Sequence, residues 1–154
     1  MDVFLIRHAH AVDLFPDHAR TLSDRGREQV RTLARFLKRS ESFSPDEFWH
    51  SPYLRARETA ELLASELESN VLCREMPGLT PEDDPIAFGR TLVASKRSVA
   101  VVGHEPHLSA LASLLVAGND SPPVFAMKKG ATLALERGGR LWVVRWHVYP
   151  DLLA

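Results

Sequence analysis

Two short apolar segments constrain the fold of this chain more than any other feature. Residues 3–6 and 98–102 are nearly continuous runs of apolar side chains, several of them β-branched. Such runs are too short for a convincing helix and are typical of parallel strands that are buried on both faces. We therefore expect them to be adjacent inner strands of one α/β sheet.

Each of these predicted strands ends in side chains that can bind a ligand or take part in catalysis. The first runs directly into Arg7 and His8, and the second runs into Gly103 and His104. Open α/β sheets bind their ligands at the carboxyl ends of parallel strands. The pattern therefore predicts a functional site at this edge of the sheet.

A third strand end adds another cation. Residues 47–50 indicate a short strand, and Ser51 and Pro52 follow at once. Serine is a good N-cap and proline is favoured at the first helical position, so we predict a helix over residues 52–67. Arg55 would lie in its first turn, where the helix dipole favours an anion rather than a cation. An arginine at that position indicates that an anion binds there as well.

The rest of the chain alternates between predicted helices and strands. Apolar periodicity and turn residues predict helices over residues 23–39, 86–95 and 107–117, a strand over 71–73, and a hairpin of 130–136 with 140–146. Residues 11–22 form a long polar loop, and loops of that length are often functional. The pattern predicts a three-layer α/β/α sandwich with a mostly parallel central sheet and a C-terminal hairpin.

Composition excludes several classes of protein. The chain has 154 residues, 45% of them apolar, and a net charge of -1, which gives no reason to expect nucleic acid or an anionic membrane as partner. No segment approaches the roughly 20 apolar residues of a membrane span. Cys73 is the only cysteine, which excludes a disulfide framework and a cysteine-based metal site. With a strand directly at the N-terminus, a cytoplasmic location is expected.

Two arginines, two histidines and a helix N-terminus thus converge on one edge of the predicted sheet. Arginine presents a rigid fork of donors that suits phosphate oxygens. A neutral histidine can act as a nucleophile, and a protonated one can stabilise negative charge. This combination predicts a pocket for a dianionic phosphoryl group.

These residues lie in three short motifs. The motifs are Arg7-His8-Ala9, Ser51-Pro52-Tyr53-Leu54-Arg55-Ala56 with Thr59, and Gly103-His104-Glu105-Pro106. In this order and spacing they resemble the motifs of the histidine phosphatase (phosphoglycerate mutase-like) superfamily. The segment 19–26, soon after the first motif, is similar to its bacterial phosphohistidine phosphatase branch, the SixA type. The resemblance covers about residues 1–147.

The resemblance implies a single domain over residues 1–154 and a phosphoryl transfer in two steps. His8 would attack phosphorus and become phosphorylated, and water would then hydrolyse the phosphohistidine. Arg7, Arg55 and His104 would hold the phosphoryl oxygens, and Arg20, an arginine of the phosphohistidine branch, would also bind phosphate. The family's chemistry implies neither a metal ion nor another cofactor, because the cationic side chains balance the charge.

The implied substrate is a phosphohistidine on a protein, namely a histidine-containing phosphotransfer domain in signal transduction. Two features depart from the usual pattern of the superfamily. Ala9 stands where glycine is usual, and no motif selects a general acid, although Glu82, Asp83 and Asp84 lie in roughly the right loop. The phosphohistidine branch likewise lacks an evident acid.

Other functions remain open from the sequence. A small-molecule phosphomonoesterase of the same superfamily would use the same motifs, whereas a mutase would need larger insertions. A non-catalytic module that binds phosphoproteins would have no use for the nucleophile. A metal hydrolase is suggested by His8 and His10, with His104 and His107, but that pattern belongs to a barrel of about 250 residues.

Overall fold

The two apolar segments form neighbouring strands at the centre of a six-stranded sheet. In a computed structural model that describes residues 1–154, β1 (Asp2–Arg7) and β4 (Val99–Gly103) pair in parallel. Both lie inside the sheet, whose strand order is β3-β2-β4-β1-β5-β6. The prediction that these segments are adjacent inner strands is confirmed.

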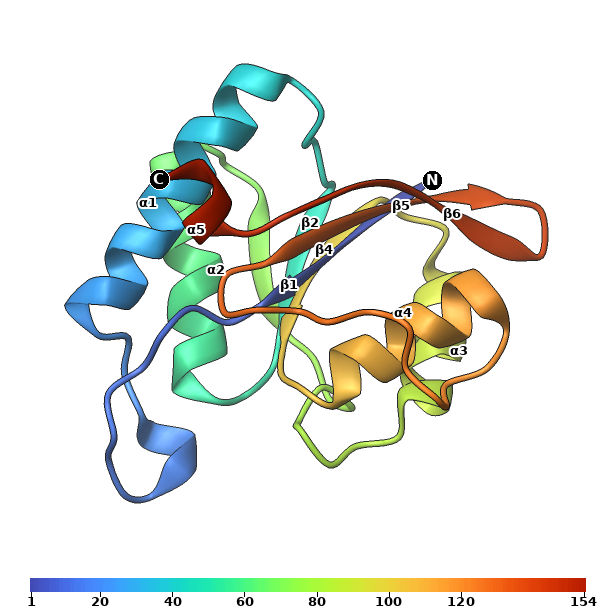
Figure 1. Cartoon of the computed structure of the whole chain (residues 1–154), viewed down its shortest axis with the longest axis horizontal. Helices are drawn as coiled ribbons and strands as arrows, with labels where there is room; N and C mark the ends of the chain where they lie inside the picture. The colour runs from blue at the N-terminus through green and yellow to red at the C-terminus, as the bar shows by residue number, and fades with distance from the viewer.

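The remaining strands complete a mostly parallel sheet. β2 (Glu47–His50) pairs in parallel with β4, and β3 (Leu72–Glu75) pairs in parallel with β2. β5 (Thr132–Gly138) runs antiparallel to β1 and forms a hairpin with β6 (Leu141–Val148). Because β1, β2 and β4 are parallel neighbours, their carboxyl ends lie at the same edge of the sheet (Figure 1).

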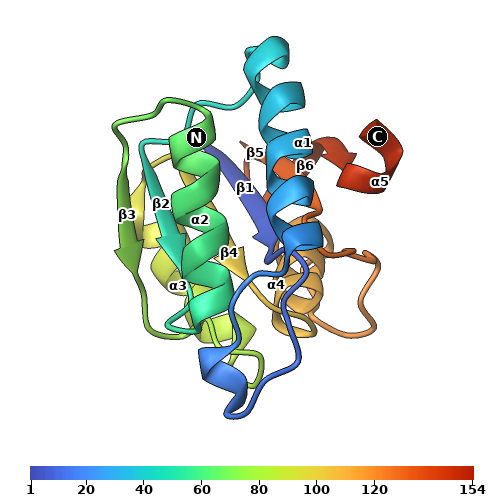
Figure 2. The same ribbon diagram turned by 90° about the vertical axis from the view of Figure 1, so that its left-hand side faces the viewer.

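Helices cover both faces of this sheet, as the α/β/α prediction requires. α1 (Asp24–Ser40) and α2 (Leu54–Glu66) pack together on one face, and α3 (Pro85–Ser95) and α4 (His107–Ala117) pack together on the other. Figure 2 shows α1 and α2 in front of the strands and α3 and α4 behind them. The predicted three-layer sandwich with a C-terminal hairpin is confirmed.

The central strands are apolar throughout because each face of the sheet has its own hydrophobic core. Side chains alternate between the two faces of a strand. Val3 and Leu5 belong to the cluster that includes the side chains of α3 and α4, whereas Phe4 and Ile6 belong to the cluster on the side of α1 and α2. All four side chains are buried.

The start of α1 is held close to the segment that follows β1. Ser23 caps the helix as predicted, since its Oγ accepts a hydrogen bond from Gly26 N at 3.0 Å. Ser23 N in turn donates to His10 O at 3.0 Å. A Cβ at residue 26 would lie 2.0 Å from His10 O, so only glycine permits this approach of helix and loop.

The predicted start of α2 is wrong by two residues. The helix begins at Leu54 with Tyr53 as its N-cap, so Ser51 is not the cap and Pro52 is not helical. Ser51 N still donates to Val102 O at 3.1 Å, which keeps the chain extended beside β4. A turn is therefore needed before the helix can begin, and Ser51 Oγ closes it by accepting from Tyr53 N at 3.1 Å. Arg55 nevertheless lies in the first turn, as predicted.

Other elements also differ from the prediction: the two hairpin strands lie one or two residues later than predicted, and the loop of residues 11–22 contains a short 3-10 helix, η1 (Asp17–Ala19). β3 lies slightly later than residues 71–73, and α5 (Pro150–Leu153) was not predicted because four residues carry no helical periodicity. α5 packs against α1. None of the helices has the length and apolar character needed to span a membrane.

Candidate active site

His8 lies at the carboxyl end of β1, where its backbone is fixed to the neighbouring strand. Its N–H donates to Gly103 O at 3.0 Å, and the residue is only 5% exposed. Ring Nδ1 lies 2.7 Å from Ala9 O. Because a carbonyl oxygen can only accept, Nδ1 carries the proton and Nε2 keeps its lone pair. Nε2 accepts a hydrogen bond from Arg55 Nε at 3.3 Å.

His104 follows β4 and faces His8. The two ring centroids are 5.1 Å apart, and His104 is 1% exposed. Its Nε2 lies 2.7 Å from Ser51 Oγ, while its Nδ1 is buried without a hydrogen-bond partner. The ring of Tyr53 lies against it, with centroids 4.9 Å apart. The three strand ends therefore meet at one point, as the sequence predicted.

The two arginines of the motifs are held in different ways. Arg7 Nη1 donates to Met127 O at 2.9 Å, and its buried Nε has no partner within the protein. Burial lowers the pKa of the Arg7 guanidinium, an effect that Glu105 opposes. Arg55 is buried, and its Nη1 and Nη2 donate to the backbone oxygen and carboxylate of Asp17 at 2.8 and 3.2 Å.

Arg20 joins the same polar network without contacting His8. Its Nε donates to Val12 O at 2.8 Å, and its Nη1 donates to Asp17 Oδ1 at 3.2 Å. Asp17 lies in the short helix η1 (Asp17–Ala19) of the long loop. The carboxylate of Asp17 thus connects Arg20 to Arg55, so Asp17 and Arg55 stand between Arg20 and His8.

Burial keeps both histidines neutral at pH 7. The pKa of His8 is lowered from 6.5 to about 3, mainly by burial and in addition by the nearby cations Arg55 and Arg7, against the opposing effect of the Ala9 carbonyl. Burial, followed by repulsion from His8 in its protonated form and from Arg55, also lowers the pKa of His104 to about 3. A neutral imidazole is the form that can attack phosphorus. A bound dianion would act in the opposite direction and raise both pKa values.

Ala9 takes up the glycine position of the motif without backbone strain. It does not have a positive φ, and its side chain is fully buried in the hydrophobic core. Its N–H donates to Thr59 Oγ1 at 3.1 Å, and Thr59 Oγ1 donates to Arg55 O at 2.7 Å. The backbone at residue 9 therefore does not require glycine, and Thr59 links the first and second motifs.

The three acidic residues of the loop before α3 have other partners or none. Asp83 Oδ2 accepts from Thr80 N at 2.8 Å, and Asp84 caps α3 by accepting from Ile86 N at 2.9 Å. Glu82 is exposed. No hydrogen bond or ion pair joins any of them to His8 or His104 in this structure, so the geometry does not select a general acid among them.

Two contacts of the site could not be found from sequence. Asp17 carries no motif signal, because its contact with Arg55 depends on the conformation of the whole loop. Ser51 was expected to cap a helix, whereas its hydroxyl reaches His104.

The paired histidines His8 and His10 do not converge on a metal site. His10 Nδ1 lies 2.6 Å from Ser23 Oγ, and no three His, Cys, Asp or Glu side chains gather as metal ligands.

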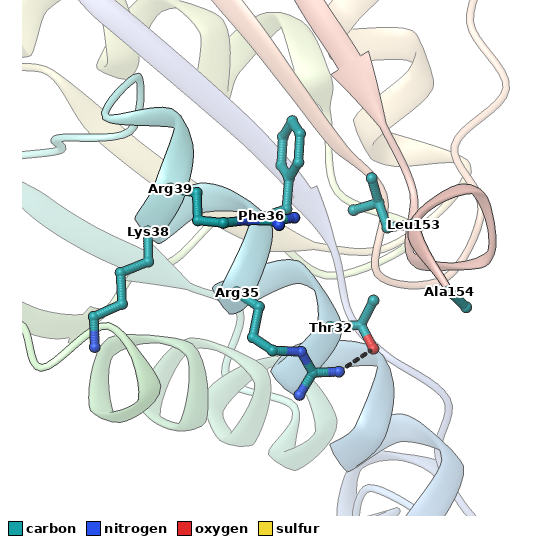
Figure 3. A pocket seen from close by; sticks show the side chains of 7 residues that line it. All are labelled: Thr32, Arg35, Phe36, Lys38, Arg39, Leu153 and Ala154. Carbon is teal, nitrogen blue, oxygen red and sulfur yellow. Dashed lines mark hydrogen bonds between the residues drawn. The ribbon is translucent and has the colours of Figure 1, made fainter.

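A separate hollow of about 520 Å³ lies between the second half of α1 and the C-terminal residues (Figure 3). Its lining includes Arg35, Phe36 and Leu153 but no residue of the strand ends. The guanidinium of Arg35 already donates hydrogen bonds to Thr32 and Glu28. The chemistry that the motifs predict is therefore at the strand ends and not in this hollow.

Fold and site together define a phosphoryl-transfer domain of the α/β/α class with a histidine at the end of its first strand. The family model "Histidine phosphatase superfamily (branch 1)" matches residues 3–80. The chain belongs to this superfamily and is a phosphatase, and enzymes of this family work without a metal ion.

Individual relatives agree with this assignment. The chain is 30% identical to phosphohistidine phosphatase SixA of Escherichia coli (strain K12), over 97% of this chain and 94% of the relative. It is similar to a solved structure of the protein histidine phosphatase SixA complexed with tungstate, with a TM-score of 0.90, 26% identity and full coverage of both chains. An alpha-ribazole phosphatase from Shigella flexneri shares the fold, with a TM-score of 0.74, 19% identity and coverage of 94% and 95%.

Proposed function

We propose that this single-domain protein is a phosphohistidine phosphatase that removes phosphate from a phosphorylated histidine on a protein, a histidine-containing phosphotransfer domain. One observation carries the proposal. His8 presents the unprotonated Nε2 of a neutral imidazole beside the guanidinium of Arg55, while Nδ1–H is held by a backbone carbonyl. The similarity to phosphohistidine phosphatase SixA supports the choice of substrate.

In the proposed reaction, His8 Nε2 attacks phosphorus in line and forms a P–N bond. The substrate's imidazole, first protonated by solvent on its other ring nitrogen, leaves as a neutral imidazole when its own P–N bond breaks, and the departing nitrogen keeps the electron pair. Water then attacks the phosphorylated His8, releasing inorganic phosphate and regenerating the neutral imidazole. Phosphoryl transfer of this kind depends mainly on positioning and electrostatic stabilisation.

Arg7, Arg55 and His104 are proposed to bind the phosphoryl oxygens during both steps. The free Nε of Arg7 and the free Nδ1 of His104 are buried polar groups that an oxyanion could satisfy. His104 would donate once the bound dianion has raised its pKa. Arg20 is proposed to contribute positive charge through its contact with Asp17 rather than by direct contact with His8.

The leaving group explains why an enzyme without a fixed acid would prefer phosphohistidine. An alkoxide is a poor leaving group unless an acid protonates it, and such help is worth about 10²–10⁴-fold. An imidazole is far less basic and can be protonated before the P–N bond breaks. The partners already found for Asp83 and Asp84 support this view.

The test compares kcat/KM for a phosphohistidine protein with kcat/KM for a panel of phosphate monoesters. We expect the phosphohistidine protein to be the better substrate, and we expect Glu82→Gln, Asp83→Asn and Asp84→Asn to change the ratio little. Faster turnover of an ester, combined with a large loss in one of these variants, would identify a phosphomonoesterase with a true general acid.

A further inference from the structure

A second basic feature adjoins the candidate active site. A hollow of about 370 Å³ is lined by four cationic side chains, and we call it the basic hollow. Arg7 belongs to both the basic hollow and the strand-end site. Asp151 contributes the only carboxylate among the lining residues. The complete lining is Arg7, His10, Arg25, Gln29, Lys128, Lys129 and Asp151.

The cations of the basic hollow are largely unpaired. Neither Arg25 nor Lys129 forms an ion pair or a side-chain hydrogen bond within the protein, and the ammonium of Lys128 lies 5.0 Å from the centre of the Tyr149 ring. Partial burial, followed by the positive charges of Arg7, Arg20 and Arg25, lowers the pKa of Lys129. Like charges held this close repel one another, and an anion among them would relieve that repulsion.

Backbone contacts fix both walls of the basic hollow relative to the nucleophile. On one side, Gly130 N donates to the backbone oxygens of Arg7 and His8 at 3.1 and 3.2 Å, which holds the neighbouring Lys129 in place. On the other side, Gly26 allows the first turn of α1, which carries Arg25, to pack directly on His10 O. The backbone on both walls of the basic hollow is therefore held against the segment that follows β1.

Arg7 thus lines the basic hollow and also precedes His8 at the end of β1, whereas His8 itself is not part of the lining. The transferred phosphoryl group belongs at His8, so the basic hollow remains for a different anionic group of the same substrate. Arg25 and Lys128 are exposed, which makes the hollow accessible to the surface of another protein. Exposed cations at the rim of an interface select partners by charge.

We infer that the basic hollow binds Asp or Glu side chains that flank the phosphohistidine on the protein substrate, and so determines which phosphoproteins the enzyme accepts. This inference rests on the proposed function for the identity of the phosphorylated residue, but its charge preference can be measured without turnover.

The experiment uses two peptides that carry the same non-hydrolysable phosphohistidine analogue. One has glutamate on both sides of the analogue and the other has glutamine. Dissociation constants are measured by calorimetry at low salt for the wild-type protein, for Arg25→Gln, for Lys129→Gln and for the double variant. Lys129→Arg, which keeps the positive charge that Lys129→Gln removes, is measured in the same way. Arg90→Gln is the matched control, because Arg90 is an exposed arginine of α3, on the opposite face of the sheet.

We expect wild type to bind the glutamate peptide about tenfold more tightly, the combined effect of two partly exposed ion pairs. The double variant should lose this preference while binding the glutamine peptide as wild type does, and Lys129→Arg and Arg90→Gln should keep it. The preference should also shrink as salt screens the charges. Equal affinity of wild type for both peptides, or a preference that survives in the double variant, would overturn the inference.

The same measurements with matched phosphoserine peptides separate this inference from the proposed function. If the turnover comparison described above shows that the protein hydrolyses esters better than phosphohistidine, the proposed function fails. A glutamate preference that depends on Arg25 and Lys129 would then still establish the basic hollow as the acidic docking site, now for a phosphoester protein. Absence of the preference in both peptide series would reject the docking site whatever the substrate.

Discussion

Asp17 accepts two hydrogen bonds from the guanidinium of Arg55, on the side away from His8. Arg55 Nη1 and Nη2 donate to the backbone oxygen and carboxylate of Asp17 at 2.8 and 3.2 Å, while Nε donates to His8 Nε2 at 3.3 Å. All three nitrogens of Arg55 are therefore engaged. A phosphoryl group that binds Arg55 through its fork must compete with the Asp17 carboxylate or displace it.

Removing this carboxylate should strengthen phosphate binding. Burial opposes ionisation of Asp17, but the hydrogen bonds and charges of Arg20 and Arg55 outweigh it and lower the pKa, so the group is ionised at pH 7. We expect Asp17→Asn to lower the inhibition constant of inorganic phosphate about two- to fivefold, since a partly exposed ion pair is worth up to about 1 kcal/mol.

Asp13→Asn is the control for this measurement, because Asp13 contacts Arg20 at 3.7 Å but makes no ion pair with Arg55. A higher inhibition constant in Asp17→Asn would show the reverse relationship, in which Asp17 holds Arg55 in its phosphate-binding position.

The nucleophile can be identified by trapping. We expect His8→Ala to abolish turnover while phosphate still binds, because Arg7 and Arg55 remain. In wild type, rapid quenching during turnover should leave a phosphate that is stable to base and labile to acid on His8 alone. His18→Ala, in an exposed residue of η1, should be as active as wild type. Activity in His8→Ala, or label on another residue, would exclude the proposed mechanism.

Arg55 should be needed as a fork of donors and not only as a charge. By analogy with lost oxyanion donors, we expect Arg55→Ala to lower kcat by about 10²–10³. Arg55→Lys should also be impaired, because an ammonium is a point charge without the planar fork of donors that suits two phosphoryl oxygens. Arg57→Ala provides the control on the same helix, where Arg57 is exposed and paired with Glu61. Unchanged kinetics in Arg55→Ala would place the phosphate site elsewhere.

The parts of the site that follow from topology could be predicted from sequence. His8 and His104 end two apolar runs, and parallel pairing of buried strands then places both at one edge. The contact of Asp17 with Arg55 could not be predicted, because it depends on how twelve loop residues fold rather than on a periodic pattern. The start of α2 was misjudged because strand pairing of Ser51 outweighed its preference as a cap.

The buried histidines should make folding stability depend on pH in a defined window. The pKa values of His8 and His104 are about 3 in the folded protein, against 6.5 when unfolded. Between these values the unfolded chain binds more protons than the folded one, so stability falls as pH falls below 6.5. Each histidine contributes a slope of about 1.4 kcal/mol per pH unit, which amounts to about 2 kcal/mol between pH 6.5 and 5.

We therefore expect His104→Gln to lose less stability than wild type between pH 7 and 5, by about 2 kcal/mol, in urea unfolding followed at each pH. His18→Gln should lose as much as wild type, because His18 is exposed. Inorganic phosphate should stabilise wild type more at pH 5 than at pH 7, and so reduce the loss, since a bound dianion favours the protonated imidazole. Equal losses in His104→Gln and wild type would show that His104 is already accessible to protons in the folded protein, and would remove the electrostatic basis for a neutral histidine pair.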